Sequence, residues 1–184
     1  MDNFGKEKLL LHACCAPCSI YVINQLLDKF DLTVYFFNPN IFPEDEYLQR
    51  LAEVKEFCRR QKIKYIEEHY QPKHWLNFIK GYEQEPEKGF RCDLCFLLRL
   101  GKTAEFAQAN GFGWFSTTLT MGRQKNSLQV LNAGRKVEGK YGIKFWDQDF
   151  KKKYGTQIAD WLAGRLGLYR QDYCGCVFPR RSES

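Results

Sequence analysis

The feature that most constrains the fold is an alternation of short apolar runs with longer amphipathic segments. The short runs are rich in β-branched and aromatic residues, which favours strands at residues 8–13, 32–38, 64–67, 112–118 and 143–146. The longer segments carry apolar side chains three or four apart, which predicts helices at residues 20–30, 44–61, 75–79, 92–110, 125–141 and 156–166. Strands separated by helices form parallel sheets through right-handed crossovers. We therefore expect a single α/β domain over residues 1–184, built on an open, mostly parallel sheet flanked by helices, with flexible ends at 1–7 and 180–184.

Seven of the eight cysteines fall in three short groups that are far apart in the sequence: Cys14, Cys15 and Cys18, then Cys92 and Cys95, then Cys174 and Cys176. A chain of 184 residues can bury a core without covalent staples, so folding alone gives no reason for this grouping. The sequence shows no signal peptide and no long apolar run, and we expect a cytoplasmic protein without a membrane span. Clustered thiols in a reducing compartment are typical of metal or redox sites.

The first cysteine group lies where a predicted strand passes into a predicted helix. Backbone N–H groups and the helix dipole favour anions at such a turn, and thiolates are stabilised there. In open α/β sheets, ligands bind beyond the carboxyl ends of the strands. The Cys14 group should meet residues 38–40 and 117–120 at that edge, which predicts a cysteine-rich metal site there.

The residue types leave the metal open. A closed zinc site would take four of these thiolates and leave three clustered cysteines without a role, whereas an iron–sulfur cluster is favoured by the surplus. Cys174 and Cys176 are separated by one glycine, which permits a tight backbone and indicates either a reversible dithiol pair or ligands of a second metal. Cys58 and His12 are interpreted as buried structural residues.

The positive charge is concentrated in the last third of the chain. Residues 1–120 hold 15 basic and 16 acidic side chains, whereas residues 121–184 hold 13 basic and 6 acidic ones, including the run Lys151, Lys152 and Lys153. This asymmetry is typical of a protein that binds a polyanion such as nucleic acid, and a solvated basic face is the alternative. Neither common glycine-rich nucleotide loop occurs, so ATP and NAD are not supported.

Four motifs together resemble one family. They are Leu-Leu-His-Ala-Cys-Cys-Ala-Pro-Cys-Ser, Tyr-Phe-Phe-Asn-Pro-Asn-Ile, Glu85-Pro-Glu87 leading into Arg91-Cys-x-x-Cys-Phe-x-x-Arg99, and Tyr169-Arg-Gln-Asp-Tyr-Cys-Gly-Cys176. The chain resembles the QueH-type epoxyqueuosine reductases over almost its whole length. Phe42, where many relatives carry histidine, and Met121-Gly122 depart from the family pattern.

The resemblance implies a Rossmann-like fold similar to the ATP-pyrophosphatase (HUP) arrangement, and reductive deoxygenation of epoxyqueuosine to queuosine at the wobble position of tRNA. It implies a [4Fe-4S] cluster on Cys14, Cys15, Cys92 and Cys95, no cobalamin, and a redox-active disulfide pair at Cys174 and Cys176. Cys18 is left unassigned.

Removing the epoxide oxygen as water takes two electrons and two protons, and a [4Fe-4S] cluster normally passes one electron at a time. The Cys174–Cys176 dithiol or a second iron would store the other, with an electron donor that the sequence does not identify. Two alternatives come from other classes: a tRNA sulfur-transfer enzyme of the ATP-pyrophosphatase kind, and a zinc-stabilised RNA-binding module. The first would need a phosphate loop where Cys-Cys-Ala-Pro-Cys-Ser stands.

Overall fold

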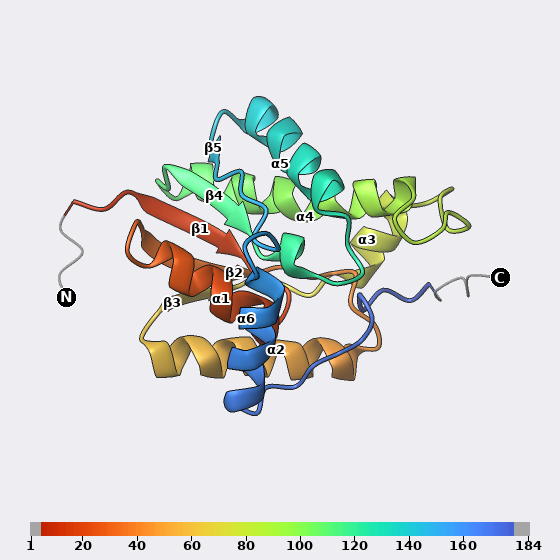
Figure 1. The fold of residues 1–184 in the computed structure, drawn as a ribbon. Coiled ribbons are helices and arrows are strands. Elements are labelled where there is room, and N and C mark those ends of the chain that lie inside the picture. Colours follow the sequence, from red (N-terminus) through yellow and green to blue (C-terminus); the bar gives the residue numbers. More distant parts are fainter. Residues whose placement is uncertain (1–4, 179–184) are drawn as a thin grey trace.

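A parallel five-stranded sheet forms the centre of the computed structural model, which describes residues 5–178 (Figure 1). The strands are β1 (Lys8–His12), β2 (Asp31–Phe36), β3 (Lys64–Glu67), β4 (Trp114–Thr117) and β5 (Lys144–Phe145). Their order across the sheet is β3-β2-β1-β4-β5, and every neighbouring pair is parallel. The expected single α/β domain with an open parallel sheet is confirmed.

The period-two alternation of β1 divides the core between the two faces of the sheet. Leu9 and Leu11 point into one apolar cluster, and Leu10 points into the other. All three side chains are fully buried. Because both faces are covered, all three central residues of the strand are apolar, as is usual in parallel sheets.

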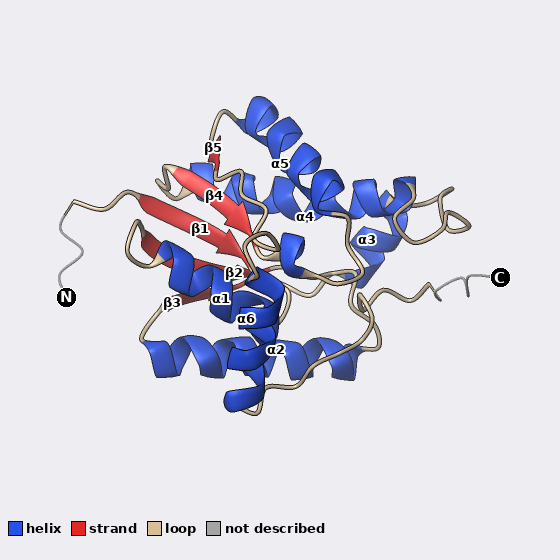
Figure 2. Cartoon of the chain, in the orientation of Figure 1, coloured by secondary structure: helices blue, strands red, loops and turns tan. Residues whose placement is uncertain are grey.

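Helices cover both faces (Figure 2). The first face carries α1 (Ala16–Leu26) and α2 (Glu44–Gln61), with α6 (Gly155–Arg165) packed on α1. The second carries α4 (Phe90–Ala109) and α5 (Ser127–Tyr141), which pack against each other, and the short α3 (Pro72–Phe78) contacts α4. A 3₁₀ turn, Leu119–Met121, follows β4. No helix among residues 5–178 is long and apolar enough to cross a membrane.

The first helix begins four residues before the position predicted from periodicity. Cys15 is its N-cap residue and Pro17 lies in its first turn, where a fixed φ suits a helix and a missing N–H costs nothing. Cys18 is therefore inside the helix, one turn from Cys14 and Cys15. The helix also ends four residues early, at Leu26.

The other boundaries lie within three residues of their predicted positions. Of the ends expected to be flexible, residues 1–4 and 180–184 lie outside the described part of the chain. Within the first of these ends, the exposed Lys6 ammonium donates to the Leu27 carbonyl and the exposed Glu7 carboxylate accepts from the Trp114 indole.

The turn after β1 occupies the point where the chain changes direction in the sheet. β2 and β3 lie on one side of β1, whereas β4 and β5 lie on the other. The loops leaving β1 and β4 therefore diverge at their carboxyl ends, which is where open α/β sheets form ligand crevices.

Candidate metal and redox site

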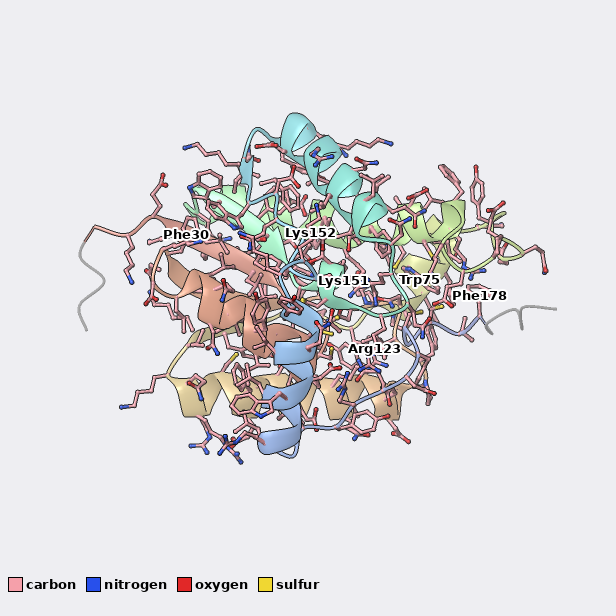
Figure 3. All side chains as sticks on the ribbon, in the orientation of Figure 1. Phe30, Trp75, Arg123, Lys151, Lys152 and Phe178 are labelled. Carbon is pink, nitrogen blue, oxygen red and sulfur yellow. The ribbon has the colours of Figure 1, made fainter. Side chains whose placement is uncertain are left out.

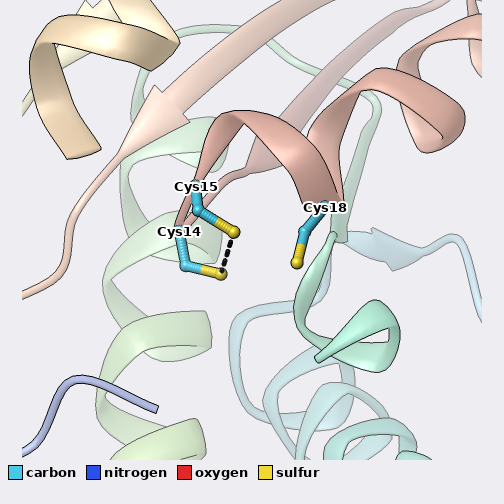
Figure 4. A group of neighbouring side chains, drawn as sticks. All are labelled: Cys14, Cys15 and Cys18. Atoms are coloured by element: carbon cyan, nitrogen blue, oxygen red, sulfur yellow. Dashed lines mark hydrogen bonds between the residues drawn. The ribbon is translucent and has the colours of Figure 1, made fainter. Parts of the chain in front are cut away.

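The first three cysteines form a compact group at the start of α1. Their sulfur atoms lie within 4.8 Å of one another, and a 3.8 Å hydrogen bond joins Cys14 and Cys15 (Figure 4). Cys18 faces the other two from the next turn of the helix. The Thr118 hydroxyl lies 4.0 Å from the Cys14 sulfur, so the turn after β4 borders this group of cysteines.

The last four cysteines face a neighbouring space. Cys92 and Cys95, at the start of α4, line a cavity together with Cys174 and Cys176 of the C-terminal segment. A second cavity is lined by the Cys14 group and Cys174. Cys174, Gln124 and Lys125 line both, so the two cavities adjoin. The structure thus brings all seven grouped cysteines to one edge of the sheet.

Four helices begin at these cavities. Residues of the first turns of α1 and α6, including Pro17 and Thr156, line the first cavity. The second is lined by Cys92 from α4 and by Asn126, the N-cap residue of α5. The positive ends of four helix dipoles therefore converge where the thiols gather, which favours thiolates and other anions.

The Cys14 and Cys174 thiols are the two that the site favours as thiolates. Hydrogen bonding with Cys15 and Cys18 holds the pKa of Cys14 well below its ordinary value, and Lys125 and Arg99 add positive charge. Hydrogen bonding with Cys176 lowers the pKa of Cys174 in the same way. The hydrogen-bond partners show the opposite shift, because hydrogen bonding to Cys14 raises the pKa of Cys15 to about 12 and hydrogen bonding to Cys174 raises the pKa of Cys176. Burial raises the pKa of Cys92 to about 11.

Two cations lie between the thiol groups. Arg99 is 1% exposed, donates to the Asn38 side-chain oxygen at 2.5 Å, and reaches the Cys95 sulfur at 4.0 Å. Burial opposes the charged form of Lys125, yet neighbouring Cys14, Cys174 and Cys18 keep its pKa raised. The sequence placed Arg99 only within the family motif and gave Lys125 no place beside the thiols, because only the fold brings the two cations to them.

Cys174 and Cys176 face each other as free thiols, with 3.2 Å between their sulfur atoms. This separation is longer than an S–S bond, so the disulfide expected from the sequence is not supported among the described residues. Gly175 adopts a φ of +98°, a conformation that L side chains rarely adopt, and this turns the two flanking side chains toward each other.

The residues interpreted as structural have that role here. His12 is fully buried and hydrogen-bonded to the Thr117 hydroxyl and the Phe37 carbonyl, and burial followed by the Arg99 charge lowers its pKa to about 3. Cys58 is 1% exposed, and burial raises its pKa to about 12. Both remain neutral at physiological pH.

The family model described as "Epoxyqueuosine reductase QueH" matches residues 9–182. The chain belongs to the QueH family of epoxyqueuosine reductases. Relatives of that name include proteins from Haemophilus influenzae, 40% identical over 98% of this chain and 74% of the relative, and Acinetobacter baylyi, 41% identical over 95% and 81%. The protein from Thermotoga maritima is 35% identical, with 92% of this chain and 88% of the relative covered.

A solved structure shares the fold. The U34-tRNA thiolase NcsA from Methanococcus maripaludis, solved with its [4Fe-4S] cluster, superposes with a TM-score of 0.54 at 12% identity. The match covers 91% of this chain and 59% of the thiolase. The likeness shows a shared fold, and the family match places this chain with the epoxyqueuosine reductases.

Proposed function

We propose that this chain reduces epoxyqueuosine in tRNA to queuosine without cobalamin, using a [4Fe-4S] cluster and the Cys174–Cys176 thiol pair. One observation carries the proposal: seven cysteines from three distant segments line two adjoining cavities at the carboxyl edge of the sheet. Membership of the QueH family supplies the substrate.

The residues present suit an iron–sulfur cluster. Cys14, Cys15, Cys92 and Cys95 are the proposed ligands, and thiolates are the ligands that such clusters take. Within residues 5–178, the Trp75 indole N–H and the Arg99 Nε–H are buried without a partner, and both residues line the cavity that holds Cys92 and Cys95. Buried donors left unpaired are costly, and the sulfurs of a cluster would accept from them. Arg99 and Lys125 would balance its negative charge.

When bound, the cluster would supply one-electron transfer beside the substrate. The thiol pair supplies both electrons and both protons that the reduction needs. Oxidation of Cys174 and Cys176 forms one S–S bond and releases two electrons and two protons. The epoxide takes up the two electrons and the two protons, and its two C–O bonds break. The products are a carbon–carbon double bond and one water molecule.

Lys125 is the cation that we assign to the departing oxygen. Its side chain lines both cavities, and its raised pKa keeps the amine protonated. An N–H donor at that oxygen stabilises the charge that develops as the C–O bonds break. A second iron is the alternative store for electrons, and the amount of iron per chain distinguishes the two versions.

Positively charged side chains near the first cavity suit a tRNA partner, whose phosphates are negative. Arg123 lines this cavity, and Lys151 and Lys152 precede α6, whose first turn faces it (Figure 3). Phosphates attract such side chains whatever the base sequence. The electron donor that reduces the thiol pair again is a separate partner.

The test is anaerobic turnover of epoxyqueuosine-containing tRNA, followed by mass analysis of the released nucleosides. The reconstituted protein should form queuosine, and Cys174→Ser and Cys176→Ser should abolish its formation while retaining cluster absorbance. Cys58→Ala is the matched control, because Cys58 lies in the core away from both cavities. A fully active Cys174→Ser, Cys176→Ser double variant would reject the thiol pair. A colourless zinc protein without activity would favour the RNA-binding alternative.

A further inference from the structure

Arg50 is a buried cation in the middle of α2. It is 2% exposed and its Nε donates to the Glu46 carboxylate, one turn earlier, at 2.6 Å. Removing two charges from water is expensive, and a buried ion pair is weak evidence for stability by itself. The guanidinium has a second set of contacts, and these lie on the C-terminal segment.

Three contacts join Arg50 to the segment that carries the thiol pair. Its NH1 group donates to the Cys174 carbonyl at 3.4 Å, and the guanidinium carbon lies 5.4 Å from the centre of the Tyr173 ring. A Cβ atom placed on Gly175 would lie 3.1 Å from both terminal nitrogens. The guanidinium therefore packs directly against the glycine between the two cysteines.

The same face of α2 holds the segment at a second point. The Tyr169 hydroxyl donates to Glu46 at 3.2 Å, and the Tyr169 backbone N–H donates to Glu53 at 3.0 Å. Glu46, Arg50 and Glu53 are spaced by four and three residues, so they share one face of the helix. The Phe42 N–H, just before α2, donates to the Gly175 carbonyl at 2.7 Å.

We propose that Arg50 is a positioning residue for the Cys174–Cys176 pair, holding the Cys174 carbonyl, the Tyr173 ring and the Gly175 backbone so that the two sulfurs face each other. Closing the pair forms one S–S bond and transfers two electrons and two protons to the epoxide in turnover, or to oxidised glutathione, which becomes two reduced glutathione molecules, in the assay below. Arg50 favours closure because the loop is already ordered in the thiol form. This assignment rests on the proposed function only for its identification of the pair as the redox couple.

The effect of Arg50 on closure is measured directly by the thiol–disulfide equilibrium constant of the Cys174–Cys176 pair. The full-length, cluster-loaded protein is equilibrated anaerobically in buffers of reduced and oxidised glutathione, then quenched and alkylated. Trypsin releases residues 171–180 as one peptide, whose only cysteines are Cys174 and Cys176. Mass spectrometry of this peptide gives the fraction of closed pairs at each glutathione ratio.

Arg50→Gln should lower the equilibrium constant for closure about tenfold, which for a two-electron couple is a shift of about 30 mV. Arg50→Lys keeps the charge beside Glu46 but lacks the planar fork, so it should fold normally and still lower the constant. Arg59→Gln is the matched control, because Arg59 is an exposed arginine on the same helix that pairs with Glu56. Melting temperature and cluster absorbance are measured for each variant.

A wild-type equilibrium constant in Arg50→Lys would overturn the proposal, as would an equal shift in Arg59→Gln. Because tRNA is absent from the assay, its result is independent of the reductase proposal. A shifted constant in a protein that forms no queuosine would leave the positioning role in place and reject the activity.

Discussion

Two glycines in α5 should respond oppositely to the same substitution. A Cβ atom on Gly134 would lie 2.2 Å from a carbon of the Phe145 ring, far inside van der Waals contact. That ring is 4% exposed and packs on Phe115 with 5.0 Å between ring centres, so it has little room to move. Gly139 has no heavy atom within 4 Å of the corresponding position.

The expected changes in stability follow from two competing effects. Alanine in place of glycine gains about 1 kcal/mol of helix stability in the middle of a helix. Forcing a methyl group into a filled core costs about 3 kcal/mol at the upper end of the usual range. Gly134→Ala should therefore lose about 2 kcal/mol, which for a chain of this size lowers the melting temperature by about 4–8 °C. Gly139→Ala should gain about 0.5–1 kcal/mol and melt about 1–4 °C higher.

Calorimetry or circular dichroism on the two variants and the wild type decides the question. Both variants carry the same substitution in the same helix, so propensity alone would shift them in the same direction. A Gly134→Ala protein that melts at or above the wild type would refute the close packing of α5 on Phe145.

Three further predictions concern the site and its surroundings. Cys92→Ser should lower iron per chain after anaerobic reconstitution whereas Cys58→Ala should not, and full iron with an unchanged spectrum in the former would remove Cys92 from the ligands. Charge reversal at Lys136, Lys152 and Lys153 should flatten the slope of log affinity for tRNA against log salt by about one unit per lost phosphate contact, and an unchanged slope would place the RNA surface elsewhere. Burial raises the pKa of Cys58 from 9.0 to about 12, so the stability that its neutral thiol contributes is complete below pH 9 and is lost as the pH rises toward 12. The difference in unfolding free energy between wild type and Cys58→Ala should therefore shrink from pH 9 to pH 12 in denaturant melts.

The sequence predicted the sheet well because its signals are local. The apolar run of β1 and the three- and four-residue spacing of α2 each specify an element without reference to the rest of the chain. The start of α1 was missed because periodicity begins at Ile20, whereas Pro17 is the signal that places the first turn earlier. The expected boundary therefore left Cys18 in the turn with Cys14 and Cys15, whereas it lies inside the helix.

The cations of the site could not be predicted in the same way. Arg50 belongs to an amphipathic helix and Lys125 to a polar turn, and the motif that contains Arg99 does not show which groups that side chain contacts. Their roles come from contacts with residues tens of positions away, such as Arg99 with Asn38 and Arg50 with Cys174. Only the packing of the helices on the sheet brings these charges to the thiols.

The central claim is that the Cys174–Cys176 pair supplies the two electrons that remove the epoxide oxygen. The most direct measurement is a single anaerobic turnover of reduced, cluster-loaded protein with epoxyqueuosine-containing tRNA and no added reductant, with queuosine and the closed form of the peptide of residues 171–180 quantified in the same sample. The account predicts one disulfide formed for each queuosine. Queuosine that accumulates while the pair stays fully reduced would contradict it.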